Sequence, residues 1–364
     1  MLTRELNFLK IYSKHRLKEE ATMPTPQPSL EEWRSLYCAA IDFWKIQPWN
    51  WMNDTDLFGV KNPENEEIGY CCVVGALGEF LGLLVYLGAE GLESYMKILR
   101  SESPEEDVLA TGKCLVASFG DRKPLQKQDH DMIKRLGLKF RGEKSWPMFR
   151  SYEPGYYPWY LNQTQVRFLT LALQQAVEIS LRMKLNGNLL MNSKKGQYLI
   201  RVPEKSETDL HWKDEWLSPT PPERATKESL VPDEIRLQRI KKKGLRPAGI
   251  WEVDFFQFPM PIQEGGRPFF PFCLLIVDQD SGFVFGTHLE SKDHHRSEFL
   301  KQMLKVIEAN AYLPQEIWVK RDEVFQLFEI LVSRLGLKIK QMKKLNQLEY
   351  AQKSMKSFLS SGKM

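Results

Sequence analysis

The pattern of apolar and polar positions along residues 24–216 alternates between helical and strand periods. Ser29 followed three residues later by Glu32 forms a capping box, and apolar residues then recur at helical spacing, which predicts an amphipathic helix. A second long helix is expected after Asn162, a typical N-cap residue. Short apolar segments bounded by Gly, Pro and Asn predict a mixed or antiparallel sheet. Strands are expected at 56–61, 70–74, 83–87 and 113–119, helices at 89–100 and 126–136, and an extra hairpin at 197–203 and 210–216.

Residues 146–160 follow neither period, because three prolines stand among seven aromatic residues. This composition predicts a packed loop rather than a regular helix. Aromatic rings flanked by arginines could stack on bases or on a peptide, which makes this region a candidate binding site. Burial in the core is the competing interpretation, and we favour it. The candidate binding residues are Arg141, Trp146, Arg150, Tyr156 and Trp159.

Proline and charge then mark a change of domain, as expected for a chain of 364 residues. Pro219, Pro221 and Pro222 begin a linker at 217–247, which contains a short basic helix that ends at Gly244. We therefore expect an N-terminal extension at 1–23, an α+β domain at 24–216 and an α/β domain at 248–364. Met23 precedes a proline-rich segment and is a possible translation start in place of Met1.

The last domain has the clearest order of elements, which is βββαβαβα. Its later alternation of strands and helices requires parallel pairing, and residues 278–282 (Asp-Gln-Asp-Ser-Gly) predict a hairpin turn. Strands are expected at 249–256, 270–278, 282–289, 315–320 and 337–341, and helices at 293–310, 323–335 and 347–360.

This order resembles the ribonuclease H-like fold, and the local sequence is similar to the core domain of retroviral-type integrases and transposases. The residues that carry the resemblance are Trp-Glu-Val-Asp at 251–254, the turn at 278–282, and the segment 314–322 leading to Leu-Gly-Leu at 335–337. The whole chain also resembles uncharacterised bacterial two-domain proteins of unknown function, through residues 140–156.

The integrase resemblance implies that Asp254, Asp322 and Glu349 would hold two metal ions. Such a cluster stabilises the attacking and leaving oxygens of a phosphodiester. Capping offers a competing explanation, because Asp322 begins a helix, and Asn346 with Glu349 has the spacing of a capping box.

Composition and charge narrow the function little. The formal charge of +4 does not by itself support nucleic-acid binding, and five scattered cysteines fit a reducing cytoplasm. No signal peptide or membrane span is expected.

The sequence therefore predicts a cytoplasmic, non-catalytic binding or interaction protein with a degenerate ribonuclease H-like domain and no cofactor. The alternative is a metal-dependent nuclease or phosphotransferase that acts on nucleic acid with Mg²⁺ at the three acids. A protein partner is possible under the first hypothesis, and a purely structural partner in a complex is a third possibility.

Overall fold

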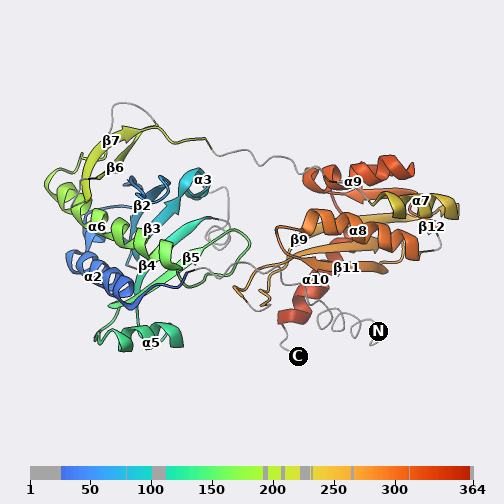
Figure 1. The fold of residues 1–364 in the computed structure, drawn as a ribbon. Helices are drawn as coiled ribbons and strands as arrows, with labels where there is room; N and C mark the ends of the chain where they lie inside the picture. Colours follow the sequence, from blue (N-terminus) through green and yellow to red (C-terminus); the bar gives the residue numbers. More distant parts are fainter. Residues whose placement is uncertain are drawn as a thin grey trace. The chain divides into compact units, whose positions relative to one another are not determined.

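The computed structural model describes residues 26–78, 80–100, 112–191, 196–205, 210–221, 230, 233–263, 266–310 and 312–360. The chain divides into two compact units, Met1–Arg224 and Ala225–Met364 (Figure 1). The extension expected at 1–23 and the start proposed at Met23 lie outside the described residues.

A seven-stranded sheet forms the centre of the first unit, with the order β5-β4-β3-β2-β1-β6-β7. Neighbouring strands are antiparallel except β1 and β6, which are parallel. The hairpin expected at the end of this domain is therefore part of the main sheet. The strands are β1 (Phe58–Lys61), β2 (Ile68–Val74), β3 (Leu81–Leu87), β4 (Cys114–Gly120), β5 (Trp146–Tyr152), β6 (Tyr198–Lys205) and β7 (Leu210–Leu217).

Helices cover both faces of this sheet, because its strands are apolar on both sides. Cys71 and Val73 of β2 belong to the core beneath α2 and α6, whereas Tyr70 and Cys72 pack in the layer that contains Tyr95 of α3. The helices are α2 (Leu30–Ile46), the 3₁₀ turn η1 (Pro48–Asn50), α3 (Gly88–Leu99), α5 (Lys127–Arg135) and α6 (Gln163–Leu185).

The prediction of a loop over residues 146–160 is wrong for the first half of this segment, because Trp146–Tyr152 form strand β5. Pro147 lies opposite Phe119 of β4. The strand is at the edge of the sheet and pairs on one side only, so a residue without an N–H group is tolerated there.

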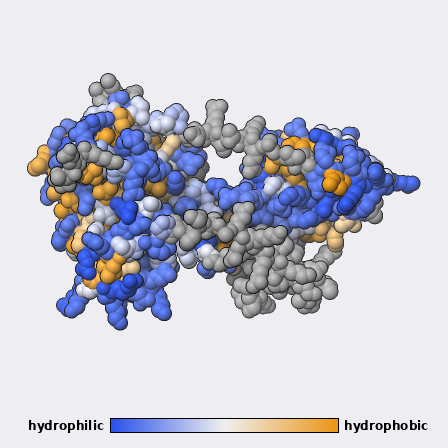
Figure 2. All heavy atoms as spheres, in the orientation of Figure 1, coloured by the Kyte–Doolittle hydropathy of each residue, from blue (hydrophilic) through white to orange (hydrophobic). Residues whose placement is uncertain are grey.

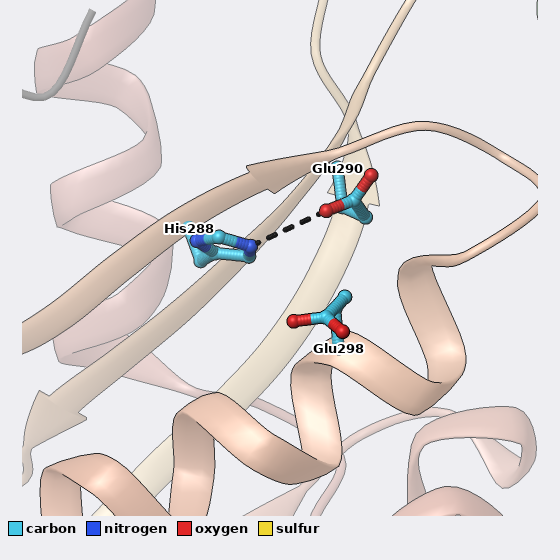
Figure 3. A group of neighbouring side chains, drawn as sticks. All are labelled: His288, Glu290 and Glu298. Atoms are coloured by element: carbon cyan, nitrogen blue, oxygen red, sulfur yellow. Dashed lines mark ion pairs between the residues drawn. The ribbon is translucent and has the colours of Figure 1, made fainter. Parts of the chain in front are cut away.

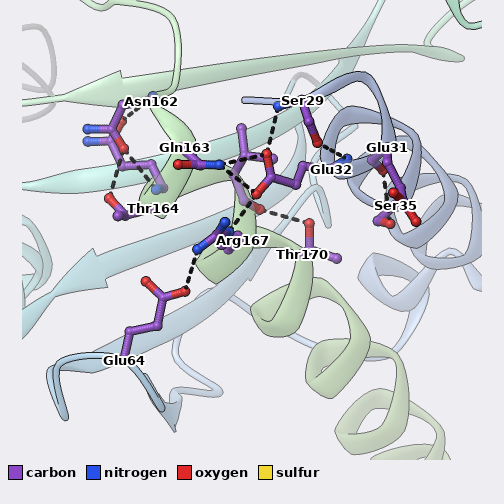
Figure 4. A network of polar contacts seen from close by, with 12 residues as sticks. Ser29, Glu31, Glu32, Ser35, Glu64, Asn162, Gln163, Thr164, Arg167 and Thr170 are labelled. Atoms are coloured by element: carbon purple, nitrogen blue, oxygen red, sulfur yellow. Dashed lines mark hydrogen bonds and ion pairs between the residues drawn. The ribbon is translucent and has the colours of Figure 1, made fainter. Parts of the chain in front are cut away.

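The N-termini of α2 and α6 are joined by a polar network centred on Glu32 (Figure 4). The expected capping box is confirmed: the Ser29 amide donates to Glu32 at 2.6 Å, and the Glu32 amide donates to the Ser29 hydroxyl at 3.2 Å. Arg167 and Gln163 of α6 donate to the same carboxylate at 2.6 and 3.0 Å. Asn162 caps α6, as the sequence predicts.

The second unit contains a five-stranded sheet in the order β11-β10-β9-β13-β14. The first three strands in sequence are antiparallel, and β13 and β14 run parallel to β9. This is the strand order of the ribonuclease H-like fold, so the expected fold class is confirmed. The strands are β9 (Ile250–Gln257), β10 (Phe272–Asp278), β11 (Val284–Glu290), β13 (Glu316–Val319) and β14 (Lys338–Gln341), and a separate short pair is formed by β8 (Arg246–Pro247) and β12 (Tyr312–Leu313).

Among the described residues, three helices cover one face of this sheet and one helix covers the other. Leu237 and Ile240 of α7 are buried in the core of the second unit, so the basic helix expected inside a linker is packed and not merely solvated. Its C-cap is Gly244, as predicted, in the left-handed conformation that glycine adopts readily. The first face carries α7 (Glu234–Lys243), α8 (His295–Ala309) and α9 (Asp322–Leu335), and the second carries α10 (Asn346–Ser360).

The surface shows small apolar groups scattered among hydrophilic residues on the face drawn in Figure 2. Within the described parts of the chain, no helix is both long enough and apolar enough to cross a membrane.

We predict that Glu32→Gln destabilises the first unit by about 1 kcal/mol near neutral pH, as the loss of a helix cap does. The backbone amide of Ser29, together with Arg167 and Gln163, lowers the pKa of Glu32 to about 2. Because this folded-state pKa lies below the unfolded value, the stabilisation is present above about pH 4.5 and is lost as the pH falls toward 2. Urea unfolding from pH 7 to pH 2.5 should therefore show the gap between wild type and variant closing in acid.

Glu31→Gln is the matched control, since Glu31 lies in the same first turn and is exposed. It should cost less than Glu32→Gln at pH 7. A gap between wild type and Glu32→Gln that stays constant down to pH 2.5 would contradict the role of the ionised carboxylate.

Candidate functional site

Strand β9 carries two acids on the side of the sheet that α10 covers. Residues alternate between faces along a strand, so Glu252 and Asp254 share one face, whereas Trp251, Val253 and Phe255 belong to the core on the other. Glu252 and Asp254 are only 2% and 8% exposed. A carboxylate buried to this degree needs a compensating partner.

Asp254 has that partner in Arg321, the residue before α9. The Arg321 guanidinium donates to Asp254 Oδ1 from Nη2 at 2.6 Å and from Nε at 3.1 Å. It also donates to the carbonyl of Phe255 and lies over the ring of the same residue. Burial raises the pKa of the Asp254 carboxyl, and the positive charge of Arg321 opposes that rise. The first candidate metal ligand is thus held in an ion pair.

Asp322 and Glu349 do not have the capping roles that the sequence suggests. The N-cap of α9 is Arg321, and Asp322 lies in the first turn, where it accepts a hydrogen bond from Gln341 at 2.7 Å. Helix α10 begins at Asn346, so Asn346 is not its N-cap. Glu349 accepts from the Lys320 ammonium at 3.0 Å, and this contact lowers the pKa of Glu349.

The three candidate acids do not converge as a metal site. Among the described residues, Asp254, Asp322 and Glu349 form no group whose carboxylate oxygens all lie within 4.8 Å of one another. Each carboxylate accepts a hydrogen bond from a different side chain of the protein.

The carboxylate that caps α10 is Glu252, a residue that the sequence analysis missed. The amide of Leu348 donates to Glu252 Oε2 at 2.8 Å, across 96 positions of the chain. Burial raises the pKa of Glu252, and the amides at the start of α10 oppose the rise. The sequence did contain a signal for this role. Glu252 and Asp254 lie two positions apart in an apolar strand, so both can be expected to be buried and to need a partner.

Among the binding candidates in the first unit, Arg150 is a buried residue with an ion-pair partner. It is 6% exposed and donates to both oxygens of Asp129, at 2.8 and 2.6 Å. The Tyr160 ring also packs against its guanidinium. The guanidinium of Arg150 is therefore engaged within the fold by Asp129 and Tyr160, and a binding role for Arg150 stays a prediction.

The aromatic candidates are half-buried. Trp146 packs against Phe140 and against the guanidinium of Arg122. Trp159 exchanges backbone hydrogen bonds with Ser151 of β5, at 2.8 and 3.0 Å. Tyr156 is half-buried as well. These residues are built into the end of the sheet.

Arg141 differs from the other candidates because it is exposed and lines a cavity of about 220 Å³. Lys45 and Lys139 line the same cavity, and Lys45 pairs with Asp42 at 3.1 Å. The apolar part of the wall contains Ile41, Pro147 and three aromatic side chains: Trp44, Phe119 and Phe140.

A second group of side chains that could ligate a metal ion lies in the second unit, on the face of the sheet opposite to Asp254. His288 and Glu290 of β11 and Glu298 of α8 point toward one another (Figure 3). Nε2 of His288 lies 3.5 Å from Oε2 of Glu290. Although burial raises the pKa of Glu290, hydrogen bonds from His288 and Ser291 outweigh it, and the net shift is downward.

The strand order β11-β10-β9-β13-β14 defines the second unit as a ribonuclease H-like domain. Residues 33–201 match the family model described as Domain of unknown function (DUF7309), and residues 236–356 match the model described as Domain of unknown function (DUF6930). The expectation of two domains of unknown function is confirmed.

Two solved structures similar to this chain are the HTLV-2 integrase catalytic core domain in complex with magnesium, in a trimeric and a dimeric form. They are 19% and 20% identical over 32% of this chain and over 72% and 74% of theirs, with TM-scores of 0.25 and 0.24. A comparison of the chain with curated proteins found no match. At these TM-scores the likeness carries no argument, so the assignment of a ribonuclease H-like fold rests on the strand order of the second unit.

We predict that Glu252→Leu frays the start of α10 and lowers the stability of the second unit by about 1 to 2 kcal/mol, the usual cost of losing a helix cap. Glu252→Gln keeps an acceptor oxygen and should cost less. Hydrogen exchange of the amides at 346–349 measures the effect directly. Equal protection of these amides in wild type and Glu252→Leu would show that Glu252 is not the cap.

Proposed function

We propose that this chain is a non-catalytic binding or interaction protein whose second unit is a degenerate ribonuclease H-like domain. The observation that carries the proposal is the pairing of Arg321 with Asp254 at 2.6 Å. A guanidinium is permanently charged and therefore competes with a metal ion for the oxygen atoms that it contacts.

The neighbouring contacts support the same conclusion. Two-metal catalysis needs several carboxylates that face two ions about 4 Å apart. Lys320 adds a second positive charge at Glu349, and Asp322 accepts from a side-chain amide. Positive groups at these positions lower the attraction for Mg²⁺.

The cavity beside Arg141 is the place we propose for a ligand. Cationic side chains with aromatic neighbours suit a negatively charged ligand that contains a flat ring, and single-stranded nucleic acid has both features. Lys139 and Arg141 are exposed and form no ion pair among the described residues. They are therefore able to contact phosphate.

We also propose a cytoplasmic location. All five cysteines are free thiols, and four of them are buried. Unpaired cysteines are the normal state in a reducing compartment.

We predict that the purified full chain does not cleave single- or double-stranded nucleic acid with Mg²⁺ or Mn²⁺, because Arg321 and Lys320 pair with the acids that would hold the ions. The assay compares wild type with Asp254→Asn and Glu349→Gln, and uses Glu329→Gln, an exposed acid on α9, as control. All four proteins should be equally inactive. Metal-dependent cleavage that both site variants abolish and the control retains, with folding intact, would establish the nuclease alternative.

We predict that Lys139→Ala with Arg141→Ala weakens the binding of a fluorescent single-stranded oligonucleotide, measured by anisotropy. Each lost phosphate contact lowers the magnitude of the negative slope of log K against log salt by about 0.7, so the double variant should lower it by about 1.4. Lys134→Ala with Arg135→Ala removes the same charge from exposed positions on α5 and is the control. Equal weakening in both double variants, or no binding by wild type, contradicts a nucleic-acid site in this cavity.

A further inference from the structure

The group formed by His288, Glu290 and Glu298 is separate from the candidate acids on β9. Leu274 of β10 pairs with His288 on one side and with Phe255 on the other, so these three residues share a face. Leu275 pairs in the same way with Thr287 and Asp254. His288 therefore lies on the face that α8 covers, and Asp254 lies on the opposite face.

Ligand-type atoms of the three side chains converge. One nitrogen and two carboxylate oxygens all lie within 4.8 Å of one another. Figure 3 shows the three side chains turned toward one another. Two ligands of a tetrahedral ion, each about 2.1 Å from the metal, are separated by about 3.4 Å. The 3.5 Å between His288 Nε2 and Glu290 Oε2 matches that separation.

The surroundings hold two of the three groups in fixed positions. His288 is 7% exposed and Glu290 is 4% exposed. The amide and hydroxyl of Ser291 donate to Glu290 Oε1 at 2.9 and 3.2 Å, which leaves Oε2 as the oxygen that faces His288. The Phe299 ring packs edge-on against the imidazole. Such supporting contacts orient ligands in protein metal sites.

Glu298 is the member of the group with the most exposed side chain, so an ion from solvent can reach it. It lies in the first turn of α8, and its side chain is 28% exposed. It pairs with Lys301 at 2.5 Å, and an exposed ion pair of this kind adds little to stability. A divalent ion that binds Glu298 can therefore displace this exposed ammonium.

We propose that His288, Glu290 and Glu298 bind one divalent transition-metal ion, and that Zn²⁺ is the ion this donor set favours. One imidazole with two carboxylates is a set that Zn²⁺ accepts, whereas Mg²⁺ is held by oxygen alone. Three protein ligands leave a position for water or another ligand. The site is independent of the proposed function, since neither Arg321 nor the Arg141 cavity takes part.

Isothermal titration of the untagged, metal-stripped full chain with ZnCl₂ tests the proposal, with MnCl₂ and MgCl₂ in parallel. Wild type should bind one Zn²⁺ per chain, Mn²⁺ more weakly and Mg²⁺ weakest. Glu298→Gln and His288→Gln should each weaken Zn²⁺ binding at least tenfold. Glu298→Gln is the more informative variant because its half-exposed position tolerates the change, and circular dichroism of each variant checks the fold.

Glu308→Gln is the matched control, an acid at the other end of α8, and it should bind Zn²⁺ as wild type does. Absence of Zn²⁺ binding by wild type, or binding that Glu298→Gln and His288→Gln leave unchanged, overturns the site. Mg²⁺ binding as tight as Zn²⁺ binding overturns the assignment to a transition metal.

Discussion

The structure of the second unit depends on how two buried carboxylates in one strand are compensated. Glu252 and Asp254 lie on the same side of β9, and both are almost fully removed from water. An unpaired buried charge costs several kcal/mol, so each acid requires its own partner. Glu252 accepts the amide of Leu348, and Asp254 accepts the guanidinium of Arg321. The central strand is thereby tied to the start of α10 and to the start of α9.

These ties restrict the chemistry of the α10 face. A ribonuclease H-like sheet can bring acids from its first strand, its fourth strand and its last helix toward one region. Here Arg321 and Lys320, which follow the fourth strand of the sheet, direct their positive charges to Asp254 and Glu349 instead. The groups that stabilise the fold are therefore the groups that would compete with metal ions. This is why we favour binding over catalysis for this domain.

The sequence predicted the order of strands and helices well, because apolar periodicity is a local property. It predicted β5 poorly, since the tolerance of Pro147 depends on the strand being at an edge, which is set by distant pairing. Capping was misassigned for a similar reason: the carboxylate of Glu252 comes from another part of the chain, and no local spacing reveals it. The grouping of His288 with Glu298 was also beyond prediction, because it depends on the rotation of α8 over the sheet.

The two faces of this sheet differ in the charged groups that they carry. The formal net charge of +4 does not reveal this difference. On the α10 face, Asp254 and Glu349 each pair with a cation, and Glu252 accepts amides at a helix N-terminus, where partial positive charge is concentrated. On the α8 face, Glu290 and Glu298 lie together, and Lys301 is the cation paired with Glu298. Two carboxylates and one ammonium leave one negative charge beside the imidazole of His288. A divalent cation balances that charge and uses the nitrogen as well, which a further lysine or arginine could not do. The same pattern of two polar residues alternating in a strand therefore leads to polar contacts within the protein in β9 and to ion binding in β11.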